Sequence, residues 1–208
     1  MIHSLILSDR RNNQYKTLGI LIFIIYPILS FPFILKGILK RERWAYLLGA
    51  ILMGYIGMLY PPAGDMYRYA EDFNLYKELD WEYFWIFMAL KFDYFLPLLS
   101  WILGKLGAYP ESTRFLFVAC SYYLLLDLYH DITLSNKDMT RRTRVYSLIL
   151  LVPLTFSIYL FRMGFAQVVL VYGIYWFLMK NRKKGLFLYN ICSLYSCQLY
   201  AFYFYCNS

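Results

Sequence analysis

Long uninterrupted blocks of apolar residues constrain the fold of this chain more than any other feature. A helix needs about 20 apolar residues to cross the ~30 Å hydrocarbon core of a bilayer, and several blocks here meet or approach that length. A soluble helix keeps one polar face, whereas 61% of these residues are apolar and only 16% are charged. The pattern predicts an all-α fold, a polytopic transmembrane helical bundle, and argues against a soluble domain.

The apolar blocks predict about six spans in a single transmembrane domain that covers residues 1–208. Ala50 and Gly54 lie four residues apart in the second block, which is the spacing that small residues take in close contacts between membrane helices. A long mixed segment, 61–112, separates the second span from the third. The predicted spans are 18–35, 44–60, 115–129, 145–161, 163–179 and 185–205.

The distribution of charge predicts the orientation. Segments 36–43, 131–144 and 180–184 carry four basic residues each, whereas 61–112 carries four basic and eight acidic residues. Cytoplasmic loops of membrane proteins are enriched in Lys and Arg, so we expect the three basic segments inside and 61–112 outside. The short apolar run 94–106 must then be interfacial or re-entrant, and both termini lie outside. The net charge of +8 thus reflects topology, and we expect no nucleic-acid partner.

The outer segment opens with a helix that carries charge on one face. Pro61 and Pro62 end the second span, and Asp65 is a suitable N-cap for the helix that follows. Asp65, Arg68 and Asp72 lie at i, i+3 and i+7 and share a face. This face is either a solvated surface with weak ion pairs or a site for an anionic substrate, since the arginine fork binds two phosphate oxygens at once. The predicted apolar face holds Met66, Tyr69, Ala70, Phe73 and Tyr76.

The length of one apolar segment places a second arginine at the outer boundary of the membrane. Residues 145–179 are almost wholly apolar, and one straight helix of that length would be ~52 Å long, too long for a bilayer. The chain must therefore turn near Arg162 and Gly164. Arg162 is either an anchor at a helix end or a second anion ligand on the same side as Arg68.

Two short motifs in this order resemble those of one protein family. The motifs are Gly64-Asp65-x-x-Arg68-Tyr69 after two spans and Phe161-Arg162-x-Gly164-x-Ala166 at the start of a later span. This arrangement resembles the EpsG family, Wzy-like polymerases of exopolysaccharides and capsules. The resemblance implies a multi-pass protein of the bacterial inner (cytoplasmic) membrane. It also implies glycosyl transfer at the outer face, in which a lipid diphosphate-linked oligosaccharide joins another repeat unit and polyprenyl diphosphate leaves.

The resemblance also implies roles for the residues that match. Arg68 and Arg162 would bind the diphosphate and stabilise the charge on the leaving group, and Asp65 would orient Arg68 or act as a base. No cofactor or metal is implied; the implied partners are the polyprenyl diphosphate-linked glycan, the bilayer and other polysaccharide-assembly membrane proteins. The alternative is a polysaccharide transporter or flippase-like component. The expected substrate-binding residues are Tyr67, Tyr69 and Gln167.

The resemblance stops in the last predicted span. The family tends to carry a His-x-Ser pattern there, whereas this chain has Tyr195-Ser196-Cys197-Gln198. One set of codons for these four residues, read one base later, encodes a His-x-Ser pattern. We therefore expect the chain to be a C-terminally truncated, inactive form of a longer protein.

Overall fold

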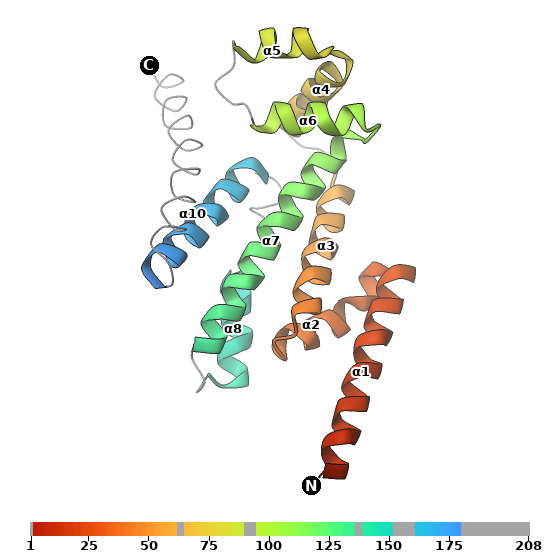
Figure 1. The fold of residues 1–208 in the computed structure, drawn as a ribbon, viewed down its shortest axis with the longest axis vertical. Coiled ribbons are helices and arrows are strands. Elements are labelled where there is room, and N and C mark those ends of the chain that lie inside the picture. Colours follow the sequence, from red (N-terminus) through yellow and green to blue (C-terminus); the bar gives the residue numbers. More distant parts are fainter. Residues whose placement is uncertain (1, 62–64, 90–94, 136–138, 152–160, 180–208) are drawn as a thin grey trace.

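The computed structural model describes residues 2–61, 65–89, 95–135, 139–151 and 161–179, and every element in these ranges is a helix (Figure 1). The all-α prediction is therefore confirmed for the part of the chain that is described. The elements are α1 (Ile2–Ile25), the 3-10 helix η1 (Pro27–Ser30), α2 (Phe31–Leu39), α3 (Arg43–Leu59), α4 (Asp65–Glu78), α5 (Trp81–Ala89), α6 (Phe95–Lys105), α7 (Pro110–Ser135), α8 (Arg141–Leu151) and α10 (Phe161–Met179).

The helix α7 is the centre of the molecule and the longest apolar element. Among the described residues it is the one helix long and apolar enough to cross a membrane, and shorter apolar helices surround it. α3 lies along α7 (Figure 1). A Cβ atom added to Gly54 of α3 would lie 2.9 Å from the Cβ of Ala119 and 2.9 Å from the backbone oxygen of Phe115, and Ala50 is buried. The close helix contact predicted from Ala50 and Gly54 is confirmed.

The predicted first span, 18–35, is divided in the structure. α1 ends at Ile25, η1 begins at Pro27, and α2 turns back along α1. Proline has no backbone N–H and interrupts the helical hydrogen bonds, so the chain folds into a hairpin here. The hairpin is closed by Phe33, whose ring lies 5.1 Å from that of Tyr15 and whose Cβ lies 3.2 Å from the position of a Cβ on Gly19.

The hairpin changes the expected position of the N-terminus. Both termini were expected on the side of the outer segment, but the start of α1 lies at the opposite end of the molecule (Figure 1). The Nζ of Lys36 sits 4.0 Å from the ring centroid of Tyr15, so the middle of α1 lies beside the start of the basic segment 36–43. The physical reason is the turn at Pro27, which returns the chain to the side where it started. The C-terminus, the span 185–205 and the basic segment 180–184 lie outside the described residues.

Three helices cap one end of α3 and α7. We call α4, α5 and α6 the cap, and the end of the bundle that they cover the cap end (Figure 1). Trp101 of α6 donates a hydrogen bond from Nε1 to the carbonyl oxygen of Leu79 at 2.9 Å, and Phe84 of α5 is fully buried between its neighbours. α6 lies across the bundle and not beside α7 (Figure 1), which is the arrangement expected for the run 94–106 if it does not span.

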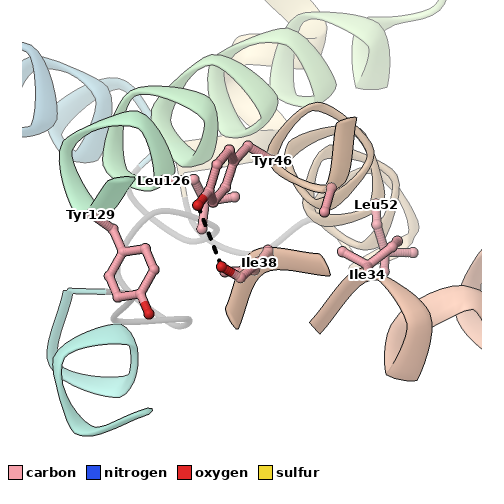
Figure 2. Packing of buried hydrophobic residues seen from close by; sticks show 7 residues of the cluster. Ile34, Ile38, Tyr46, Leu52, Leu126 and Tyr129 are labelled. Atoms are coloured by element: carbon pink, nitrogen blue, oxygen red, sulfur yellow. Dashed lines mark hydrogen bonds between the residues drawn. The ribbon is translucent and has the colours of Figure 1, made fainter. Parts of the chain in front are cut away.

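The opposite end carries the basic segment 36–43 and the described part of the segment 131–144, and we call it the basic end. The α2–α3 turn, the end of α7 and the start of α8 lie at this end (Figure 1). Its core joins three helices, with Ile34 and Ile38 from α2, Tyr46 from α3 and Leu126 from α7 (Figure 2). This packing holds the hairpin against the two central helices.

Candidate functional site

The helix α4 begins at Asp65, as the sequence predicts. Met66, Phe73 and Tyr76 are buried against the rest of the protein, whereas Arg68 is exposed. The predicted apolar face of α4 is therefore confirmed at these three residues, and Arg68 lies off it. The apolar face fixes the orientation of the helix, and this orientation leaves Arg68 at the surface of the cap end.

The position of α4 is fixed by an arginine that the sequence analysis did not single out. Arg114, at the start of α7, is only 5% exposed. It donates a hydrogen bond from Nη2 to the backbone oxygen of Met58 at 2.7 Å, and its Nη1 lies 3.1 Å from the sulfur of Met66. A cation is well placed at the C-terminal end of a helix such as α3. Arg114 thus ties α3, α4 and α7 together beside Asp65.

A signal for Arg114 is present in the sequence. It is the residue directly before the predicted span 115–129, on the same side as Arg68 and Arg162. An arginine at such a boundary is commonly a snorkelling anchor that reaches into water. The sequence position of Arg114 therefore does not reveal that it is buried and holds α4. Its burial here depends on contacts with residues 56 and 48 positions away along the chain.

The two sequence motifs converge on one apolar cluster at the cap end. We call it the Phe117 cluster; its buried members are Ala50, Leu96, Phe117, Val118 and Tyr122. Tyr69 of α4 and Phe165 of α10 both pack against it, and the rings of Phe117 and Phe165 lie 5.1 Å apart in an edge-to-face arrangement. Tyr69 is the neighbour of Arg68 in the first motif, and Phe165 lies within the second.

The helix α10 starts where the length argument requires a turn. It begins at Phe161, so Arg162 is in its first turn and lies one turn before Phe165. The side chains of Asp65 and Arg162 are outside the described part of the structure.

Two of the expected substrate-binding residues do not share this arrangement. Gln167 is exposed while its neighbours Ala166 and Val168 are buried, and it lies two residues from Phe165, on another face of α10. Tyr67 is 59% exposed and is not part of the Phe117 cluster. Of the three expected residues, only Tyr69 packs against the Phe117 cluster.

The arrangement can bind an anion at the cap end. Arg68 and Asp72 lie one turn apart on α4, a spacing at which opposite charges stabilise each other and hold the arginine in place. The planar fork of the Arg68 guanidinium can bind two phosphate oxygens at once. Comparison of the chain with family models, curated proteins and solved structures finds no match.

Proposed function

We propose that this chain is a multi-pass membrane protein in which the cap lies in the outer interface. In Figure 1, α3 and α7 run between the basic end and the cap end, α8 starts from the basic end, and α10 lies obliquely beside α7. The cap and the α6–α7 turn expose Trp81, Tyr83, Trp85 and Tyr109 by 45 to 71%, and exposed Trp and Tyr side chains concentrate where a membrane meets water. The basic end would then face the cytoplasm, in keeping with its Lys and Arg content.

We propose that the protein belongs to the Wzy-like exopolysaccharide polymerases of the EpsG type and acts on a polyprenyl diphosphate-linked oligosaccharide. One observation carries the proposal: the two motifs, about 90 residues apart in the sequence, pack through Tyr69 and Phe165 on the same Phe117 cluster. Cationic groups from more than one element would stabilise a diphosphate leaving group, and the two motifs contain Arg68 and Arg162.

In the proposed reaction a hydroxyl of the acceptor sugar attacks the anomeric carbon of the lipid-linked sugar. The bond from that carbon to the diphosphate oxygen breaks, and the electron pair leaves with polyprenyl diphosphate. Arg68 and Arg162 stabilise the charge that grows on the leaving oxygen. Asp65 accepts the proton of the hydroxyl or orients Arg68. Arg114 acts as a positioning residue, because it holds the start of α4.

The test measures binding and turnover separately. The protein is reconstituted in vesicles with a radiolabelled polyprenyl diphosphate-linked oligosaccharide, and bound substrate, released polyprenyl diphosphate and polymer length are measured. Arg68→Lys and Arg162→Lys keep the charge but lose the bidentate fork, so each should weaken binding about tenfold or more. The control is Arg142→Lys, at an exposed position of α8, which should behave as the unmodified protein.

Two results would contradict the proposal. Unchanged substrate binding in both arginine variants would show that these side chains are only anchors. Movement of the lipid-linked oligosaccharide across the bilayer without release of polyprenyl diphosphate would instead favour the transporter function.

A further inference from the structure

The apolar segment 17–35 has both of its ends at one level of the molecule. It contains no charged residue and is flanked by Lys16 and Lys36. The ring centroid of Tyr15 lies 4.0 Å from the Nζ of Lys36 and 5.8 Å from that of Lys40, so the polar flanks of the two arms lie side by side. A segment that crosses a bilayer has its flanks on opposite sides, whereas this segment starts and ends on the same side.

The two arms are too short to cross the hydrocarbon core of a membrane. α2 has nine residues and is about 14 Å long at 1.5 Å per residue, which is about half of the ~30 Å core. The apolar part of α1, residues 17–25, has the same length. In Figure 1 the turn between α1 and α2 lies at about the height of the middle of α3 and does not reach the cap, while the first part of α1 extends past the basic end.

The turn exposes a run of apolar side chains. We call it the hairpin tip; its members, which are 51 to 73% exposed, are Ile24, Ile25, Tyr26, Ile28, Leu29 and Phe31. The one polar group on these side chains is the hydroxyl of Tyr26. Another face of the hairpin is packed against the bundle, because a Cβ atom added to Gly37 of α2 would lie 2.6 Å from that of Ala45 on α3. The hairpin is thus fixed to α3 on one face, and the described residues leave its tip uncovered.

The backbone of the turn is suited to an environment without water. Pro27 and Pro32 stand at the starts of η1 and α2, where the first N–H groups of a helix have no partner, and proline has no N–H. The buried hydroxyl of Ser30 donates to the carbonyl oxygen of Pro27, and the N–H of Leu29 donates to the oxygen of Tyr26 at 3.1 Å. Local 3-10 turns and serine hydroxyls satisfy the backbone of proline-containing segments inside membranes in this way.

We propose that the α1–α2 hairpin is a re-entrant membrane anchor whose tip is covered by the acyl chains of the cytoplasmic leaflet. It enters the bilayer from the basic end and turns back near the middle of the core. Lys36, Lys40 and Arg43 at its base then lie at the level of the head groups, where basic side chains attract anionic lipids. The inference rests on the proposed membrane placement of α3 and α7, and it adds that the first part of α1 is on the cytoplasmic side.

The experiment measures the reaction of single cysteines with a membrane-impermeant maleimide in an otherwise cysteine-free protein. Gln14→Cys and Lys40→Cys stand at exposed positions of the two arms, and Leu29→Cys stands at the tip. Gln14→Cys and Lys40→Cys should react in inside-out vesicles and not in intact cells. Leu29→Cys should react in neither preparation until the membrane is dissolved in detergent. Reaction of Gln14→Cys and Lys40→Cys from opposite sides of the membrane would overturn the hairpin.

Two controls separate this inference from the proposed orientation and from oligomerisation. If Gln14→Cys, Lys40→Cys and Thr140→Cys at the basic end all react from outside, the proposed orientation is wrong but the hairpin is supported. A second copy of the chain is the alternative cover for the tip, and nanodiscs that hold one copy each distinguish the two. Leu29→Cys should stay protected in these nanodiscs; its reaction there would assign the tip to a second copy and refute the lipid anchor.

A charged variant provides a second measurement. Leu29 is 62% exposed, so its replacement removes little packing within the protein. Leu29→Asp places a carboxylate in the hydrocarbon core, where charge is costly, and most of this variant should be lost from the membrane fraction. Leu106→Asp is the matched control, because Leu106 is 77% exposed and follows α6 in the cap; this variant should accumulate as the unmodified protein does. Equal amounts of the two variants in the membrane would contradict the anchor.

Discussion

Replacement of Gly54 by a larger residue should separate the two central helices. The added Cβ would lie 2.9 Å from the Cβ of Ala119 and from the backbone oxygen of Phe115, whereas an ordinary contact begins at 3.4 Å. The helices must therefore move apart by about 0.5 Å, and such a gap removes roughly a quarter of the dispersion energy of the atoms that face it. Membrane helices associate largely through this packing, so the loss acts on the main contact of the fold.

The size of the effect follows from two opposing terms. Overpacking a close contact costs about 1–3 kcal/mol, while alanine is preferred over glycine in a helix by about 1 kcal/mol. Gly54→Ala should therefore lower the free energy of unfolding by up to about 2 kcal/mol. Gly54→Val adds two more methyl groups at the same place and should cost about 3 kcal/mol, which lowers Tm by roughly 6–12 °C in a chain of this size.

The assay is thermal unfolding of the purified variants in one detergent. Leu47→Val is the matched control, because Leu47 is exposed on α3 and a branched side chain there meets no neighbouring helix; its effect should stay within about 0.5 kcal/mol. Adding Ala119→Gly to Gly54→Ala removes one of the two close contacts and should restore part of the stability. A Gly54→Val protein with the Tm of the unmodified chain would refute the close approach of α3 to α7.

Two further predictions concern the cap end. Arg114→Ala should lower the free energy of unfolding by about 2–3 kcal/mol, because it leaves the oxygen of Met58 without its charged donor. Hydrogen exchange should also become faster at the start of α4. Unchanged exchange in α4 would show that Arg114 does not hold this helix in place. The second prediction concerns the orientation and uses single cysteines at two exposed positions of a cysteine-free protein. A cysteine at Asn74 should react with a membrane-impermeant reagent from outside intact cells, and a cysteine at Thr140 should not. Labelling of Thr140→Cys from outside would contradict the proposed orientation.

Much of the local structure follows from residue spacing alone. Long apolar blocks predict helices because only a helix satisfies its own backbone over such lengths. The start of α4 at Asp65 and the burial of Met66, Phe73 and Tyr76 follow from the helical period. The contact at Gly54 follows from the pairing of small residues. Each of these depends on residues within about one or two turns of one another, and such information is contained in the sequence.

The sequence did not determine how distant segments combine. Pro27 permits either a kinked span or a hairpin, and the packing of Phe33 on Tyr15 selects the hairpin. Arg162 has the same sequence context whether it is an anchor or a ligand. The motif that contains Arg162 lies near the motif that contains Arg68 only because Phe165 and Tyr69 pack on the same Phe117 cluster. The choice in each case depends on contacts between residues far apart in the chain.

The basic end illustrates the same physical reason. In the sequence, Arg41 and Arg144 are two of 21 basic residues, and Tyr129 is one of 23 tyrosines. In the structure, the Nε groups of both arginines and the hydroxyl of Tyr129 are buried without a hydrogen-bond partner among the described residues. Nothing local distinguishes them, because a buried donor without an acceptor exists only when separate helices have excluded water from it. The amino-acid pattern alone therefore determined the helices and their apolar faces, whereas the tertiary structure decided which polar groups are buried together, since that depends on which helix ends are packed against one another.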